Sequence, residues 1–312
     1  MNTKVIITLI FALLPIIITI CLGMLAGKLG DFDKSDATKF TKLILKYALP
    51  MNIFNGILST PRKIIIEDLP LAGWLLLAMV GTYVIAYCIF RFGAKKTDPI
   101  TKIFRALAYA NPSVPFIGSA ILPLLFAESV ASIDIGISTL LINVILLPII
   151  FAQLSNLSGE QTTIGTRIKS TLKKPLVFSA LSSFILVLCG VQMPVLLQPT
   201  FQQIGKVSGG LAMFATGIIL YTSDLKLTKQ ISINVLCKNI IVPVVILGLM
   251  MAFHMPSDVT RIVVVTLSIP TATMSSNLAI RYQKGEVEMA ATQFYSTVAA
   301  VVTLSAFMLL LS

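Results

Sequence analysis

Charged residues are scarce in this chain of 312 residues. Asp, Glu, Lys and Arg make up 12% of it, while 56% of the residues are hydrophobic. A typical soluble domain is about 25% charged and could not hide so much apolar surface. Runs of about 20 apolar residues, the length that a membrane-spanning helix needs, recur along the chain, and the short alternating segments of a membrane barrel are lacking. The composition therefore predicts an all-α integral membrane protein.

Residues typical of catalytic and metal sites are equally few. The chain has one histidine, His254, and four widely spaced cysteines that all lie in apolar runs, Cys21, Cys88, Cys189 and Cys237. This pattern fits neither a zinc site nor a disulfide framework. A phosphate-binding glycine loop with lysine and a nucleophile–histidine pair are also missing. We therefore expect no enzyme activity, no cofactor and no metal.

The net charge of +11 could indicate a nucleic-acid partner, but basic residues also flank membrane helices as topology signals. We expect ten spans, near residues 5–26, 37–58, 70–92, 100–127, 131–155, 175–193, 199–222, 230–253, 259–282 and 287–311. Loops on one side of these spans carry 13 basic residues and loops on the other side carry four. This bias places both termini outside a cell inner (plasma) membrane and argues against nucleic acid.

The chain divides into two halves of five spans each. Residues 157–174 form a polar, basic linker between residues 1–156 and residues 175–312, and an odd number of spans gives the halves opposite orientations. Short echoes recur about 160 residues apart, such as Ser138-Thr139-Leu140 and Ser296-Thr297-Val298. We therefore expect ten transmembrane helices arranged as two inverted five-helix repeats.

Proline interrupts the fourth and ninth spans at corresponding places, Asn111-Pro112-Ser113-Val114-Pro115 and Ile269-Pro270-Thr271-Ala272-Thr273. Proline removes a backbone N–H group and clashes with the carbonyl four residues back, so both helices should unwind there. A broken helix exposes a half-helix N-terminus, whose free N–H groups attract anions. The two broken helices are thus expected to cross near the membrane midplane and to bind the substrate there.

The candidate substrate-binding residues lie at and beside these breaks: Asn111, Pro112, Ser113, Pro115, Pro270, Thr271, Thr273, Asn277, Asn52 and Lys238. For the hydroxyl residues the alternative is that they satisfy the backbone of the broken helices. Asn52 could line the cavity or bond a neighbouring helix. Lys238, about 13 Å into the eighth span at 1.5 Å per residue, could supply positive potential or extend to the cytoplasmic surface.

Acidic residues are almost absent from the spans. Asp134 and Glu128 are expected at the outer end of the fifth span, and Glu288 at the inner start of the tenth. Arg105, just inside the fourth span, is expected to be an interfacial anchor. The scarcity of acids argues against a dedicated ion-coupling site, and leaves coupling through a protonated substrate or backbone carbonyls open.

Several motifs together resemble the auxin efflux carrier family, which includes plant PIN-type carriers and bacterial malate and malonate permeases. They are the run 269–273 followed by Ala279-Ile280-Arg281-Tyr282, Leu49-Pro50, Lys238 with Pro243, and Pro112 six residues before Gly118. The resemblance covers essentially the whole chain. It implies a ten-helix fold of two inverted halves, with a scaffold domain, a transport domain and crossing helices 4 and 9.

The leading hypothesis is a secondary active or facilitative transporter of small organic anions, dicarboxylates such as malate or malonate, that works by alternating access. The alternatives are a sodium-coupled symporter of the bile-acid type and a non-transporting membrane sensor, which the lack of an appended signalling domain disfavours. The expected partners are a small carboxylate and the lipid bilayer. The sequence leaves open whether two copies of the chain form a homodimer.

Overall fold

The computed structural model describes residues 2–60, 69–94, 96–157, 172–222 and 227–311. These residues form helices, with one isolated bridge between extended residues. The first half contains α1 (Asn2–Leu29), α2 (Lys34–Leu43), η1 (Ile44–Ala48), α3 (Leu49–Leu58), α5 (Leu69–Leu76), η2 (Leu77–Gly81), α6 (Thr82–Gly93), α7 (Pro99–Ala110), η3 (Val114–Gly118), α8 (Ser119–Leu125), α9 (Glu128–Leu140), η4 (Leu141–Leu146) and α10 (Leu147–Leu157).

The second half contains α12 (Pro175–Leu188), α13 (Gln198–Gly205), α14 (Val207–Thr222), α15 (Lys229–Leu236), η5 (Cys237–Ile241), α16 (Val242–Ala252), α17 (Ser257–Ser268), α18 (Thr273–Tyr282) and α19 (Glu286–Leu310). The all-α prediction is thus confirmed for the described part of the chain. The predicted linker, 157–174, falls mostly on residues 158–171, outside the described residues.

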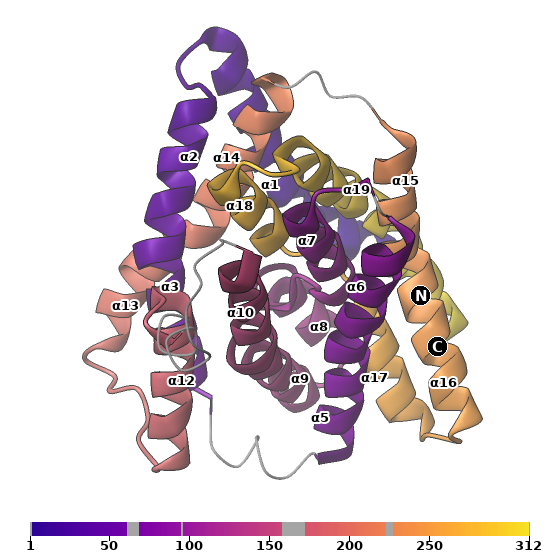
Figure 1. Cartoon of the computed structure of the whole chain (residues 1–312). Helices are drawn as coiled ribbons and strands as arrows, with labels where there is room; N and C mark the ends of the chain where they lie inside the picture. Colours follow the sequence, from indigo (N-terminus) through magenta and orange to yellow (C-terminus); the bar gives the residue numbers. More distant parts are fainter. Residues whose placement is uncertain (1, 61–68, 95, 158–171, 223–226, 312) are drawn as a thin grey trace.

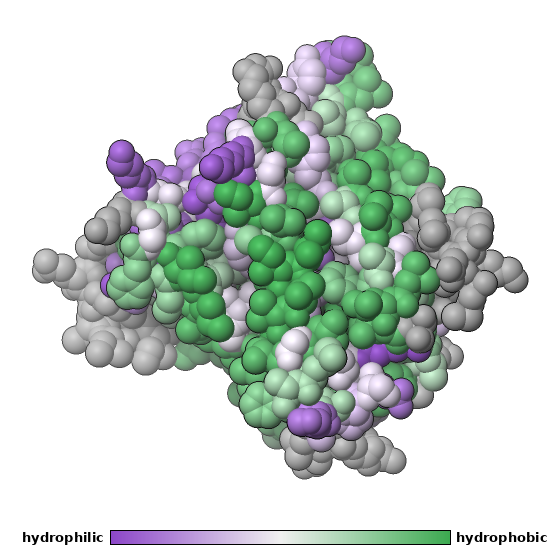
Figure 2. All heavy atoms as spheres, turned by 90° about the vertical axis from the view of Figure 1, so that its right-hand side faces the viewer, coloured by the Kyte–Doolittle hydropathy of each residue, from purple (hydrophilic) through white to green (hydrophobic). Residues whose placement is uncertain are grey.

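Helices lie at all ten expected segments. Among the described residues, five helical stretches are long and apolar enough to cross a membrane: Pro70–Gly93, Ile133–Leu157, Gln198–Thr222, Lys229–Ala252 and Glu286–Leu310. Figure 2 shows the matching surface, a broad hydrophobic field with hydrophilic residues gathered toward its upper and lower ends. The arrangement of ten spans as two inverted repeats stays a prediction.

Proline does not end the helices that contain Pro50, Pro148 and Pro243. In each case a wide π-helical turn, η1, η4 or η5, comes directly before the proline-containing helix. A proline ring clashes with the carbonyl four residues back, and a π turn moves that carbonyl away. The helical stretch that contains Pro50 is therefore continuous, with one widened turn before the proline.

The tightest packing joins α1 to α14, which lie side by side in Figure 1. A Cβ atom at Gly23 of α1 would lie 2.1 Å from the carbonyl oxygen of Phe214, and one at Gly217 of α14 would lie 2.0 Å from that of Ile20. Only glycine allows two helix backbones to approach so closely. α12 also packs against α3, so each of these two pairs joins a helix of one half to a helix of the other.

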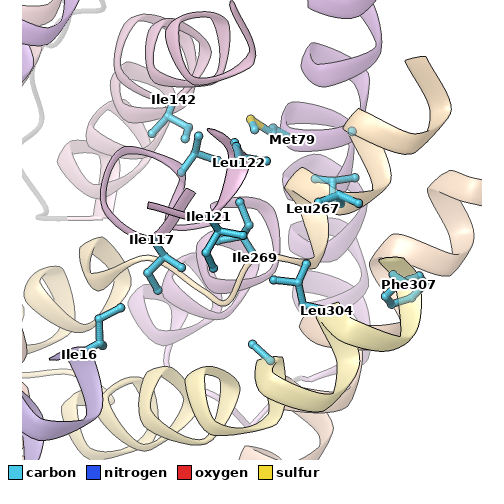
Figure 3. Packing of buried hydrophobic residues seen from close by; sticks show 14 of the residues in the cluster. Ile16, Met79, Ile117, Ile121, Leu122, Ile142, Leu267, Ile269, Leu304 and Phe307 are labelled. Atoms are coloured by element: carbon cyan, nitrogen blue, oxygen red, sulfur yellow. The ribbon is translucent and has the colours of Figure 1, made fainter. Parts of the chain in front are cut away.

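The apolar core surrounds the point where the broken helices meet. Figure 3 shows Ile117 and Ile121 of the first half gathered with Ile269 and Leu304 of the second half. All four side chains are almost completely buried. The core therefore joins the two halves around the crossing instead of filling each half separately.

Candidate functional site

The two broken helices meet through their extended backbones. α7 ends at Ala110 and α17 ends at Ser268, and an antiparallel bridge pairs Pro112 with Thr271. The Ser113 amide donates to the carbonyl of Pro270 at 2.9 Å, and the Ala272 amide donates to the carbonyl of Asn111 at 2.9 Å. Each break thus satisfies backbone groups of the other, which removes the cost of unpaired groups inside a membrane. We call residues 111–113 and 270–272 the crossing.

A polar contact from α19 supports the crossing from behind. The Thr271 amide donates to Ser296 Oγ at 3.2 Å, and Ser296 Oγ donates to Asn239 Oδ1 at 2.6 Å. Asn239 Nδ2 in turn donates to the Ser296 carbonyl at 2.8 Å. Asn239 and Ser296 are both buried. These contacts link the crossing to η5 and α19, so its position depends on both helices.

Lys238, the neighbour of Asn239 on η5, is fully buried and contacts the end of α17. Its Nζ donates to the carbonyl oxygen of Leu267 at 2.9 Å. The last carbonyls of a helix carry partial negative charge, so an ammonium group there is favourable. Lys238 therefore stabilises the broken half-helix directly, and the extension toward the cytoplasmic surface that the sequence left open does not occur.

A cavity of about 540 Å³ opens beside the crossing. Three amides line it, Asn52 of α3, Asn111 of the crossing and Asn143 of η4. Ala272, Thr273 and Met274 bring the N-terminus of α18 to its wall, and no side chain caps that helix end. None of the described lining residues is charged. The other lining residues are Leu49, Ile53, Gly56, Ser59, Thr60, Pro115, Phe116, Ile135, Gly136, Thr139 and Ile142.

The predicted site residues separate into two groups. Asn52, Asn111, Pro115 and Thr273 line the cavity. The remaining ones belong to the crossing or lie behind it: Pro112, Ser113, Pro270, Thr271, Asn277 and Lys238. Three buried oxygen atoms of this second group, Ser113 Oγ, Thr271 Oγ1 and Asn277 Oδ1, have no hydrogen-bond partner among the described residues.

The sequence interpretation missed four polar residues of the cavity, Asn143, Thr139, Ser59 and Thr60. Asn143 Nδ2 donates to the Thr139 carbonyl at 2.7 Å. This bond uses the amide nitrogen, so the Oδ1 atom of Asn143 can accept a hydrogen bond from another donor. An amide inside an apolar run, the signal that identified Asn52, is present at Asn143 as well. The cavity also has an aromatic wall, since Phe116 packs so closely on Gly209 of α14 that a Cβ there would lie 2.9 Å from its ring. The lack of a side chain at Gly209 thus allows Phe116 to approach α14 closely.

Asp134 lies at the start of the spanning stretch Ile133–Leu157, as expected, but its side chain is enclosed by the protein. Asp134 is completely buried, six residues into α9. Its Oδ2 lies 2.5 Å from Thr266 Oγ1 on α17, and its Oδ1 lies 3.5 Å from Ser138 Oγ. A single acid in an apolar helix resembles an interfacial residue in sequence, because its partner lies 132 residues away.

Arg105 is likewise not an exposed anchor. It is 8% exposed and forms a two-pronged ion pair with Glu288 at 2.6 and 2.8 Å. Asn234 Nδ2 donates to the same carboxylate at 2.8 Å, and the Tyr109 hydroxyl donates to Asn234 Oδ1 at 2.8 Å. These four residues, which we call the Arg105 cluster, tie α7, α15 and α19 together at the end expected to face the cytoplasm.

Apolar spanning helices, a backbone crossing and an amide-lined cavity are the features of a membrane transport protein. The chain belongs to the family of membrane transport proteins, the auxin efflux carrier family, which it matches over residues 8–308. This result confirms the resemblance seen in the sequence, and the protein is a multi-pass membrane transporter.

Relatives in three bacterial strains share this description. Proteins of Escherichia coli strain K12, Escherichia coli O157:H7 and Shigella flexneri, each named "Uncharacterized transporter YfdV", are 30% identical to the chain over 276 residues. The matches cover 86% of this chain and 87% of each relative. The names describe transporters, which is compatible with the expectation that the chain is no enzyme.

Proposed function

We propose that this transporter carries small organic anions, dicarboxylates such as malate or malonate, by secondary active or facilitative alternating access. The observation that carries the proposal is that the α18 N-terminus and three amides meet at one cavity without a charged lining residue among those described. A helix N-terminus presents about half a positive charge and free N–H donors. Together these groups suit a carboxylate better than a cation or an apolar solute.

The strength of the site also suits transport. A carboxylate gains strong, two-pronged hydrogen bonds from arginine, and such a pair would hold the ligand tightly. Amide donors and a helix end give weaker, directional contacts, so the ligand can both bind and leave. The cavity volume of about 540 Å³ lies within the range of about 300–1,000 Å³ that is typical of small-molecule sites.

The arrangement of the cavity supports alternating access. Its walls come from both halves, with Asn52 on α3 and Thr273 on α18. The α1–α14 and α12–α3 contacts each join a helix of one half to a helix of the other, which supports two related halves. Inverted repeats let one part of a transporter rock or move against the other around a central site. The Arg105 cluster would then close one entrance by joining three helices at the cytoplasmic end.

The test is uptake into proteoliposomes that contain the purified protein. Labelled malonate or malate should enter, and the neutral diamide of malonate, which has the same shape without charge, should not. Sodium and pH gradients are imposed separately. Uptake of a steroid carboxylate that depends on sodium would support the bile-acid type instead. Saturable binding without any uptake or exchange would support a sensor, and either result would refute the proposal.

A further inference from the structure

Asp134 is a buried acid that the carboxylate site does not use. It is fully inaccessible, and its two oxygens contact only hydroxyl groups, Thr266 Oγ1 at 2.5 Å and Ser138 Oγ at 3.5 Å. A carboxylate is costly to bury without a cation or several donors. Among the described residues none forms an ion pair with it. The surroundings therefore favour a group that holds a proton for part of the time.

Ionisable residues are few on the helices around Asp134. α9 packs against α3, α5, α8, η3 and η4, whose sequences contain no ionisable residue. On α17, Asp258 and Arg261 come eight and five residues before Thr266, about 12 and 8 Å along the helix,. Glu128 is the other acid on α9, at its first residue.

Lys238 is the remaining charged group near this site. Its ammonium contacts the carbonyl of Leu267, the residue that follows Thr266. The two buried ionisable residues thus contact neighbouring positions at the end of α17. Asp134 and Lys238 are not among the ion pairs that the described residues form. Lys238 and Asp134 thus form no salt bridge in the part of the chain that the structure describes.

The hydroxyl partners suit both protonation states of Asp134. A hydroxyl group has one donor and two acceptor positions. Thr266 can donate to an ionised carboxylate, and it can accept a hydrogen bond from a protonated one. Turning the Thr266 hydroxyl hydrogen therefore accommodates either protonation state of Asp134 without rearranging the helices.

Asp134 is also connected to the cavity on two sides. The residues that follow it on α9, Ile135, Gly136 and Thr139, line the cavity. Its partner Thr266 lies two residues before the end of α17, which leads into the crossing and the α18 N-terminus. A negative charge at Asp134 would repel an anion in the cavity, and a proton would remove that repulsion.

We propose that Asp134 is a proton site that couples proton movement to anion transport in the same direction. The proton is taken from water on one side, binds a carboxyl oxygen of Asp134, and is returned to water on the other side together with the anion. Because binding linkage is reciprocal, the anion favours the proton as much as the proton favours the anion. This inference rests on the proposed transport of carboxylates.

The test compares wild type with Asp134→Asn in proteoliposomes whose membrane potential is clamped at zero. With one proton per anion, a gradient of one pH unit should drive wild-type malonate accumulation up to about tenfold, since a pH unit is worth about 1.4 kcal/mol. Asp134→Asn should lose this accumulation and keep exchange of internal for external malonate. Asp258→Asn, an exposed aspartate on α17, is the matched control and should accumulate like wild type.

Accumulation by Asp134→Asn at the wild-type level would overturn the proposal. So would accumulation that follows a sodium gradient and is lost in the same variant, because Asp134 would then bind a metal cation. If wild type neither takes up nor exchanges malonate, the proposed function fails, and infrared difference spectra still decide the proton site. A carboxyl C=O band that titrates in wild type should shift its midpoint in Thr266→Val, which removes the hydroxyl and keeps the shape. A band whose midpoint is unchanged in Thr266→Val would refute the assignment. This test does not use Asp134→Asn, so it applies even where that variant does not fold.

Discussion

Removing the Asn111 amide tests the proposed carboxylate site most directly. The backbone of Asn111 is extended, donates to Leu107 and accepts from Ala272, both at 2.9 Å. Alanine keeps these backbone bonds and can adopt the same backbone angles, φ −111° and ψ 90°. Asn111→Ala therefore removes a side chain that lines the cavity and leaves the crossing in place.

The expected loss follows from the chemistry of one hydrogen bond. A hydrogen bond to a charged group, together with the pairing lost when it is removed, is worth roughly 1–3 kcal/mol. This range corresponds to an affinity for malonate that is about 5- to 150-fold weaker. Asn111→Asp should weaken malonate binding further, because it keeps the shape and places a negative charge beside the ligand.

Equilibrium binding of labelled malonate to purified protein measures this effect, with thermal unfolding as the check on folding. Asn55→Ala is the matched control, since Asn55 lies on α3 three residues after Asn52 and does not line the cavity. Its affinity should stay within about twofold of wild type, below the smallest loss expected for one hydrogen bond. A folded Asn111→Ala protein that binds malonate as tightly as wild type would refute the role of Asn111.

Three further predictions concern charge, packing and topology. Lys238→Gln should reduce the rate of malonate uptake roughly 5- to 30-fold more than Lys238→Arg, because a charge at a helix end is worth up to about 2 kcal/mol. Equal losses in uptake would indicate packing alone. Gly217→Ala should lower the unfolding free energy by about 1–3 kcal/mol through overpacking. The control Gly210→Ala, whose Cβ meets nothing within 4 Å, should not lower it. Thermal unfolding in detergent measures both variants. In a cysteine-free background, His254→Cys and Lys284→Cys, at exposed turns on either side of the broken ninth span, should react with an impermeant thiol reagent from opposite membrane sides; labelling from one side would contradict the topology.

The sequence allowed the breaks in the helices to be predicted, because proline acts locally. Pro112 and Pro270 remove hydrogen bonds within their own helices wherever those helices pack. Asn52 and Asn111 could be identified for a similar reason, since an amide in an apolar run needs a partner or a ligand. Asn143 carries the same signal but lies in a span without a break, so it was overlooked.

Residues whose environment depends on distant helices could not be placed in this way. Asp134 and Thr266 are 132 positions apart, and Lys238 meets Leu267 29 positions away. Sequence gives the depth of Lys238 along its helix but not the side that it faces. The burial of Asp134 follows from the packing of α9 against α17, which no local pattern encodes.

The contact between Phe116 and Gly209 has a mechanical consequence. α1 and α14 touch through their backbones at Gly23 and Gly217, so little side-chain movement can soften that contact, and the pair forms a stiff frame. Phe116 belongs to the broken segment of the first half, and its ring rests on the bare backbone of Gly209 in the same frame. Interlocking ridges and grooves resist displacement of packed helices, whereas a ring on glycine has no ridge to cross. The cavity wall at Phe116 can therefore slide along α14 while the ring stays packed on that helix.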